Sequence, residues 1–220
     1  MEANTYIVVD FDSTLVTVET LDWLADIVLE GKPEKDKVLK KITAITNMGM
    51  DGEILFQESL SRRLGLLSLT KKDVENVSNL MVDKVTPSFL RNKDFLKIYG
   101  RQVYIFSGGF VECIKPVAEM LGIPVENIYA NEFIYEDGEV VGVDLEKPMS
   151  KSGGKLEQLK ALRLKGRIYV LGDGKTDLEM RKASDLFVAF TENVSRQPVI
   201  EGADYSVKTF DEFLEKEGLR

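Results

Sequence analysis

The chain has 220 residues, of which 29 are basic and 37 acidic, and its formal net charge is −8. An acidic chain of this length can bury a core, and we expect little general affinity for nucleic acid or anionic membranes. It contains no histidine, which excludes serine–histidine triads, histidine-ligated zinc and histidine general bases. Any catalysis must use carboxylates, hydroxyls, lysine, arginine or a hard metal ion.

The cellular setting is predicted from the cysteine content and from the apolar runs. A single cysteine, Cys113, excludes an intramolecular disulfide and is typical of a reducing compartment. No run approaches the roughly 18 apolar residues of a membrane span, and the first residues lack the basic region and long apolar segment of a secretion signal. We expect a cytoplasmic protein, a monomer or a homodimer, without nucleic-acid or membrane partners.

Four short apolar runs predict buried parallel strands, because they are rich in β-branched and aromatic residues. They are residues 5–9, 102–106, 167–171 and 186–190. Segments with helical spacing lie between and after them, at residues 111–121, 155–164, 176–183 and 210–217. This alternation predicts an α/β fold, a doubly wound parallel sheet of Rossmann-like type with helices on both faces.

The alternation is interrupted between residues 15 and 78, where only amphipathic pieces occur. We predict a helical cap domain of residues 15–78, inserted after the first strand into a core domain of residues 1–14 and 79–220. Residues 131–144 hold Asp-Gly between two alternating apolar runs, which predicts a β-hairpin.

Acidic residues follow the first predicted strand. In 10-DFDST-14, Asp10 and Asp12 stand two residues apart at the strand's carboxyl end, the edge where open parallel sheets bind ligands. In an extended chain the two side chains would point to opposite sides, so the loop must turn if both serve one site. By itself, the pattern is equally well explained as an acidic helix start.

Three further motifs fall beside the same edge: 107-SGG-109, 152-SGGK-155 and 172-GDGKTD-177. Taken singly, they can be a tight turn, a surface lysine and a favourable first helical turn. Together they place Ser107, Lys155, Asp173 and Asp177 near Asp10. Clustered carboxylates repel one another unless a cation shares the site, and Mg²⁺ prefers such oxygen ligands. The set predicts phosphoryl transfer through an aspartyl phosphate.

These four motifs, in this order, resemble the haloacid dehalogenase superfamily of phosphatases. Residues 152–155, 172–180 and 193–199 resemble the corresponding segments of its phosphoserine phosphatase family, as does a helical cap after the first strand. The resemblance implies Mg²⁺-dependent hydrolysis of O-phospho-L-serine, the last step of serine biosynthesis.

The resemblance also implies roles for the motif residues. Asp10 would be the nucleophile and Asp12 the general acid and base. Mg²⁺ would be held by the Asp10 carboxylate, the Asp12 backbone carbonyl and Asp173, with Asp177 in support. Phosphoryl oxygens would be bound by Ser107, Gly108, Gly109 and Lys155, and Thr176 would lie close to the substrate.

Recognition of the amino-acid part is implied for the cap. Glu19 would bind the ammonium group, Arg63 the carboxylate, and Phe56 and Met50 would enclose the substrate. Alternatively, Glu19 belongs to an acidic helix start, and Arg63 is one of two adjacent arginines on a solvated helix face. Asp51 departs from the family, which has glycine after the pocket methionine, although an alternative register places 48-MG-49 there.

Two other functions remain open at this point. The same residues could hydrolyse another small phosphomonoester, such as phosphorylcholine, pyrophosphate or a sugar phosphate. A receiver-like signalling domain, in which a phosphorylated aspartate acts as a switch, would carry no cap.

Overall fold

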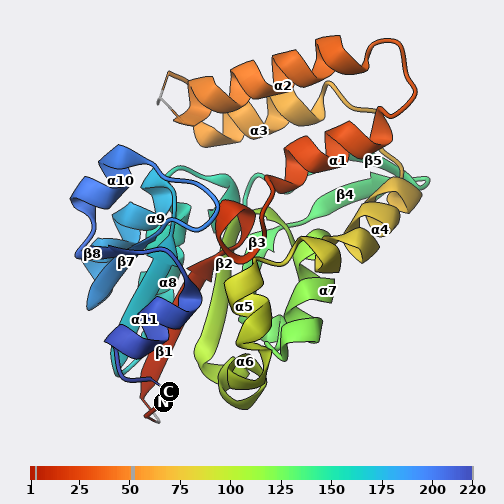
Figure 1. Ribbon diagram of the computed structural model, residues 1–220. Coiled ribbons are helices and arrows are strands. Elements are labelled where there is room, and N and C mark those ends of the chain that lie inside the picture. Colours follow the sequence, from red (N-terminus) through yellow and green to blue (C-terminus); the bar gives the residue numbers. More distant parts are fainter. Residues whose placement is uncertain (3, 51–52, 220) are drawn as a thin grey trace.

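The computed structural model describes residues 1–2, 4–50 and 53–219, without the side chain of Met50. A six-stranded sheet in the order β3-β2-β1-β6-β7-β8 runs through the molecule, and every pairing in it is parallel. Helices cover both faces of this sheet (Figure 1). The strands are β1 (Thr5–Asp10), β2 (Val103–Phe110), β3 (Ile128–Asn131), β6 (Arg167–Gly172), β7 (Leu186–Phe190) and β8 (Tyr205–Val207). The predicted doubly wound α/β fold is confirmed.

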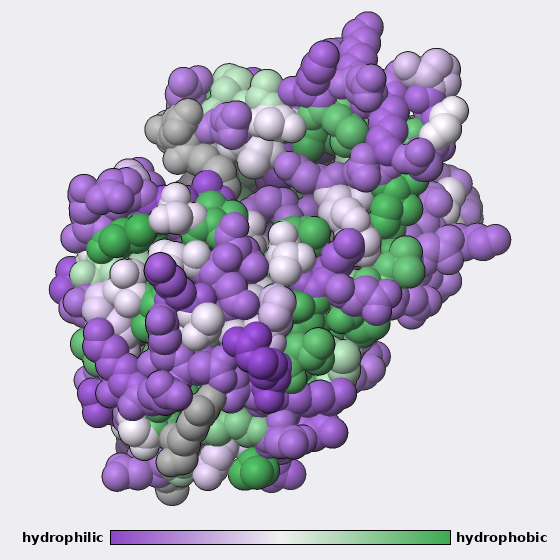
Figure 2. All heavy atoms as spheres, in the orientation of Figure 1, coloured by the Kyte–Doolittle hydropathy of each residue, from purple (hydrophilic) through white to green (hydrophobic). Residues whose placement is uncertain are grey.

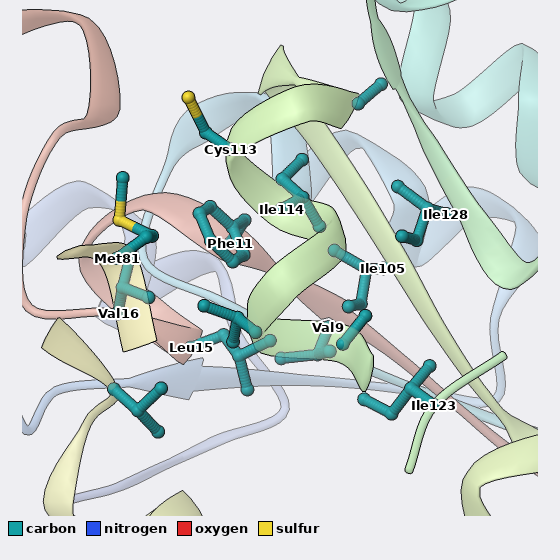
Figure 3. Close-up of a cluster of buried hydrophobic side chains, with 14 of the residues drawn as sticks. Val9, Phe11, Leu15, Val16, Met81, Ile105, Cys113, Ile114, Ile123 and Ile128 are labelled. Carbon is teal, nitrogen blue, oxygen red and sulfur yellow. The ribbon is translucent and has the colours of Figure 1, made fainter. Parts of the chain in front are cut away.

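The central strand β1 shows why the sheet forms here. Ile7 and Val9 are buried in one hydrophobic cluster and Val8 in another, because successive side chains of a strand point to opposite faces. Figure 3 shows Val9 and Phe11 beside Ile105 and Ile114 in the first cluster. The four predicted strands all occur, whereas β3 and β8 were not predicted. With four and three residues, they are too short to give a clear periodic signal.

The helices of the core divide between the two faces according to the cluster that their side chains join. Helices α5 (Pro87–Arg91), α6 (Lys93–Tyr99), α7 (Val111–Leu121) and α11 (Phe210–Lys216) contribute to the cluster of Ile7. Helices α8 (Gly154–Leu162) and α10 (Gln197–Gly202) contribute to the cluster of Val8. The helix predicted at residues 176–183 is shorter, because α9 (Lys175–Glu179) passes into a 3₁₀ turn.

Helices also fill the segment after β1, as predicted. They are α1 (Thr20–Val28), α2 (Lys35–Met50), α3 (Phe56–Leu64) and α4 (Lys71–Leu80). Figure 1 shows α2 and α3 side by side at the far end of the molecule, with α1 between them and the sheet. The side chains of α4 enter the cluster of Ile7. The boundaries of the cap domain, residues 15 and 78, stay a prediction.

The hairpin predicted at residues 131–144 is formed by the antiparallel strands β4 (Phe133–Glu136) and β5 (Glu139–Val143). Its turn residues Asp137 and Gly138 both have positive φ, 49° and 86°, as tight hairpin turns require. Much of the surface seen in Figure 2 is hydrophilic, with small apolar groups between. None of the helices in the described part of the chain has the length and apolar character that crossing a membrane requires.

Candidate active site

A sharp turn at Phe11–Leu15 brings Asp10 and Asp12 to one cavity. Asp12 is extended (φ −65°, ψ 136°) and Ser13 is left-handed (φ 54°), so the chain reverses instead of continuing as a strand. The Ser13 backbone N–H donates to the Val18 carbonyl oxygen at 3.1 Å and closes the turn. This local reversal resolves the problem that strand alternation poses for two carboxylates at one site.

Asn193, in the loop after β7, holds this turn from outside. Its side-chain Nδ2 lies 3.1 Å from the Ser13 carbonyl oxygen, 3.2 Å from that of Val16 and 2.7 Å from the Thr86 hydroxyl. The sequence does not predict this role. Residues 193–199 resemble the family, but no local pattern marks an asparagine that bonds to a turn about 180 residues away in sequence.

Three buried carboxylates, Asp10, Asp173 and Asp177, lie at the carboxyl edge of the sheet with their oxygens within 4.8 Å of one another. The Lys155 Nζ donates to Asp10 Oδ1 at 2.6 Å and to Asp177 Oδ1 at 2.7 Å. Lys155 is positioned by the start of α8, which packs closely against the preceding segment at Pro148. A Cβ on Gly154 would lie 1.7 Å from the Pro148 carbonyl oxygen, so only glycine fits there.

The carboxylates repel one another in this setting. Burial, and next the charge of Asp177, raise the pKa of Asp10 well above its ordinary value, although Lys155 opposes this. Burial, followed by Asp177, raises the pKa of Asp173 to about 6. Burial lowers the pKa of Lys155, but its ion pairs with Asp10 and Asp177 outweigh burial and the net pKa is raised. A cation beyond Lys155 would relieve the cluster.

The donor set fits a hard metal ion. It is made of oxygens only, with three carboxylates close enough to share one ion. Among the described residues, the cavity presents more acidic than basic side chains, which would repel a phosphate dianion unless a cation is added. The acidic ones are Asp10, Asp12, Glu19, Asp173, Asp177 and Glu179, and the basic ones are Arg63, Lys151, Lys155, Lys175 and Arg196.

Asp12 is poised for proton transfer. Burial, followed by the charge of Glu19, raises its pKa to about 7. Its Oδ1 accepts hydrogen bonds from the backbone N–H of Thr20, at 3.1 Å, and from the Thr20 hydroxyl. A carboxyl group with this pKa exists in both protonation states near neutral pH, as a group that gives and then takes a proton must.

The motif at Ser107–Gly109 lines the same cavity, and a Cβ on Gly109 would lie 3.4 Å from Asp12 Oδ2. Ser107 is fully buried, and its Oγ accepts a hydrogen bond from the Gly109 backbone N–H at 2.8 Å. A Cβ on Gly108 would lie 2.6 Å from the Phe56 ring of α3. The absence of a side chain at Gly108 therefore lets the Phe56 ring approach the backbone of this motif closely.

Glu19 and Arg63 line the same cavity. Glu19 Oε1 accepts from the Ser13 hydroxyl at 2.7 Å. The Arg63 guanidinium is buried, and its hydrogen bonds within the described residues are long, 3.3 Å to the Thr46 hydroxyl and 3.4 Å to the Ser59 carbonyl oxygen. Arg62 is half-exposed and pairs with Glu58 of its own helix. The structure therefore separates the two adjacent arginines and turns Arg63 into the cavity.

One cavity of about 860 Å³ brings these parts together. Among the predicted site residues, its lining includes Asp10, Asp12, Glu19, Phe56, Arg63, Ser107, Gly108, Gly109, Lys155, Asp173, Thr176 and Asp177. The side chain of Met50, and Asp51, lie outside the described residues. Arg196 was not predicted: its Nε donates to Asp173 Oδ2 at 3.0 Å, and it lies 3.8 Å from Glu19.

Known proteins are similar to this chain in both sequence and fold. The family model of haloacid dehalogenase-like hydrolases matches residues 7–182. The chain belongs to this family. Phosphoserine phosphatase of Drosophila melanogaster is 34% identical over 210 residues, 93% of this chain and 75% of that protein. At this identity and coverage, the chain belongs within the haloacid dehalogenase-like hydrolases to the phosphoserine phosphatases.

Solved structures with a similar fold support the same family assignment. A phosphoserine phosphohydrolase-like protein from Francisella tularensis superposes with a TM-score of 0.83 at 34% identity, covering 96% of this chain and 99% of that one. A phosphoserine phosphatase solved as a phospho-aspartyl intermediate analogue gives 0.74 at 28% identity, covering 98% and 99%. The predicted enzyme class, a phosphomonoester hydrolase, is confirmed.

Proposed function

We propose that this phosphatase hydrolyses O-phospho-L-serine to L-serine and phosphate through an aspartyl phosphate on Asp10. The observation that carries the proposal is the set of charged groups that share one cavity. Asp10 and Lys155 are suited to phosphoryl transfer. The same cavity holds a carboxylate, Glu19, and a guanidinium, Arg63, which are complementary to the ammonium and carboxylate groups of an amino acid.

We assign Mg²⁺ to the carboxylates of Asp10, Asp173 and Asp177 and to the backbone carbonyl of Asp12. When bound, the ion would neutralise charge on the carboxylates and on the phosphoryl group. Arg196 and Thr14 support this arrangement, since both donate hydrogen bonds to Asp173, at 3.0 Å and 3.2 Å.

In the first half-reaction, an Asp10 carboxylate oxygen attacks phosphorus, and the bond from phosphorus to the serine oxygen breaks. Lys155, the Ser107 hydroxyl and the backbone N–H groups beside it hold the phosphoryl oxygens. Asp12, protonated, gives its proton to the departing serine oxygen. The products of this step are serine and the aspartyl phosphate.

In the second half-reaction, Asp12 removes a proton from water, and the water oxygen attacks phosphorus. The bond between phosphorus and the Asp10 oxygen breaks, which releases phosphate and restores the Asp10 carboxylate. Asp12 ends protonated, ready for the next substrate. Its pKa of about 7 suits both directions of proton transfer.

Substrate selection is assigned to the inserted helices. Glu19 would accept hydrogen bonds from the ammonium group, and Arg63 would bind the carboxylate in bidentate fashion. Phe56 would cover the substrate, together with Met50, and Thr176 would contact it. The receiver-like alternative would carry no insert, and α1 to α4 occupy that place.

A substrate panel tests the proposal. Steady-state kcat/KM is measured for O-phospho-L-serine, phosphorylcholine, pyrophosphate and a sugar phosphate, each with Mg²⁺ and with EDTA. Phosphoserine should be preferred and activity should require Mg²⁺. Comparable values for all four compounds would contradict the substrate, and activity in EDTA would contradict the metal.

A cytoplasmic location belongs to the same proposal, because the buried Cys113, which forms no disulfide, suits a reducing compartment.

A further inference from the structure

Asp22, which belongs to none of the motifs, lies beside Arg63, one of the residues that line the cavity. It lies in the first turn of α1, two residues after Thr20, which binds Asp12, and three after Glu19. Its Oδ1 is buried and accepts no hydrogen bond within the described structure. The same atom lies 3.8 Å from Arg63 Nη1, beyond hydrogen-bond range but within the range of strong charge interaction.

The charges around the Arg63 guanidinium do not balance. Three carboxylates, those of Asp22, Glu19 and Asp12, act on the guanidinium of Arg63. Arg196 lies near Glu19 as well, but its hydrogen bond goes to Asp173. Burial, opposed chiefly by the charge of Arg63, raises the pKa of Asp22, and Glu19 raises it further. The guanidinium of Arg63 is therefore more than compensated before any substrate arrives.

We propose that Asp22 is a specificity-determining residue whose negative charge restricts the site to phosphomonoesters that carry an ammonium group. A substrate carboxylate at Arg63 comes close to Asp22 and is repelled by it, unless the same substrate brings a positive charge. A zwitterionic head group meets this condition, and a head group with a carboxylate alone does not. Asp22 acts through the field at Arg63 and touches no reacting atom.

Orientation of Arg63 does not depend on Asp22 alone. The guanidinium also bonds to the Thr46 hydroxyl and the Ser59 carbonyl oxygen. Thr46 also hydrogen-bonds to Asp22, and an asparagine oxygen can still accept a hydrogen bond. Replacing Asp22 by asparagine should thus remove charge and leave Arg63 in place. This separates an electrostatic role from a merely structural one, because the two predict opposite changes for substrates that need Arg63.

Two close analogues of phosphoserine serve as probes. 3-Phosphoglycerate has a hydroxyl in place of the ammonium group, and phosphoethanolamine lacks the carboxylate. In Asp22→Asn, kcat/KM should rise for 3-phosphoglycerate and fall for phosphoethanolamine, so that their ratio increases about tenfold over the unmodified protein. Asp22→Glu, which keeps the charge, should leave the ratio near its original value.

Asp26→Asn is the matched control, since Asp26 lies one turn further along α1 and pairs with Lys35 on the surface at 2.8 Å. It should leave the ratio unchanged. An unchanged ratio in Asp22→Asn overturns the proposal, and so does a fall in 3-phosphoglycerate hydrolysis alone, which would show that Asp22 merely holds Arg63. If thermal melting shows that Asp22→Asn is unfolded, the same ratio is measured in Asp22→Ser, with the same expected increase.

The inference rests on the proposed function, but the two can fail separately. The unmodified protein tests the function: phosphoserine must exceed both analogues in kcat/KM. The ratio of the two analogues tests Asp22 and requires no phosphoserine measurement. Preference for phosphoserine with an unchanged ratio would retain the function and reject the role of Asp22.

Discussion

The two cations that line the cavity from the sheet edge and from the inserted helices, Lys155 and Arg63, are held differently. At the sheet edge, Lys155 contacts Asp10 and Asp177 at 2.6 and 2.7 Å, and Asp173 and Asp177 are nearly inaccessible to solvent. On the inserted helices, Arg63 makes contacts of 3.3 to 3.8 Å. Reaction chemistry requires fixed groups, whereas recognition requires donors that a substrate can still engage. This contrast fits the proposed roles of Lys155 in phosphoryl transfer and of Arg63 in specificity.

Asp10→Asn should have the largest effect, because it removes the nucleophile at the sheet edge. We expect kcat to fall by roughly 10⁴-fold or more for every substrate, while circular dichroism stays unchanged. Acid-quenched enzyme should also carry no phosphate after incubation with labelled substrate. Retained phosphate release in this variant would place the nucleophile elsewhere.

Asp12→Asn should come next, with a loss in kcat of about 10²- to 10⁴-fold. Since the pKa of Asp12 is about 7, its acid form is lost above that pH and its base form below it. The two half-reactions need one form each, so kcat of the unmodified enzyme should peak near pH 7. A flat kcat profile between pH 5 and 9 would speak against Asp12 in both roles.

Arg63→Ala should act selectively, because it removes a recognition group carried by the inserted helices. We expect kcat/KM for phosphoserine to fall roughly 10- to 100-fold, as for a lost charged hydrogen bond, with little change for p-nitrophenyl phosphate. Arg62→Ala is the matched control, because Arg62 pairs with Glu58 instead of facing the cavity. Equal losses on both substrates would mean that Arg63 supports the fold and not recognition.

The smallest effect concerns stability without metal. Asp10, Asp12 and Asp173 have pKa values raised by burial, so the folded metal-free protein binds more protons than the unfolded chain. Their stabilising contribution is present at low pH and is lost as pH rises through about 6 and about 7. In EDTA, the melting temperature should fall by at least about 5 °C between pH 5 and 8.

Mg²⁺ should reduce this fall, and Asp10→Asn should show a weaker pH dependence because one repelling carboxylate is gone. A melting temperature that rises with pH in EDTA would contradict the raised pKa values. That result would also show that the carboxylates at the sheet edge do not repel one another strongly.

Most of the sheet, and the gathering of the motif carboxylates in one cavity, could be predicted from the sequence. The middle of β1, residues 6–9, is apolar on both faces, as a buried parallel strand requires, and parallel strands bring their carboxyl ends to one edge. Asp10, Asp173 and Lys155 could thus be assigned to one site from their order in the chain. The four-motif resemblance added their roles.

Only the tertiary structure decided what depends on contacts between distant segments. Asn193 bonds to the turn after β1 across the sheet edge, Arg196 reaches Asp173, and Asp22 meets Arg63 from another helix. The resemblance already favoured Arg63 over Arg62, but only the tertiary structure shows that Arg63 lines the cavity while Arg62 pairs with Glu58. Local sequence fixes periodicity and turn chemistry, but which side chain faces a partner far along the chain depends on how the helices pack, and no local pattern encodes that packing.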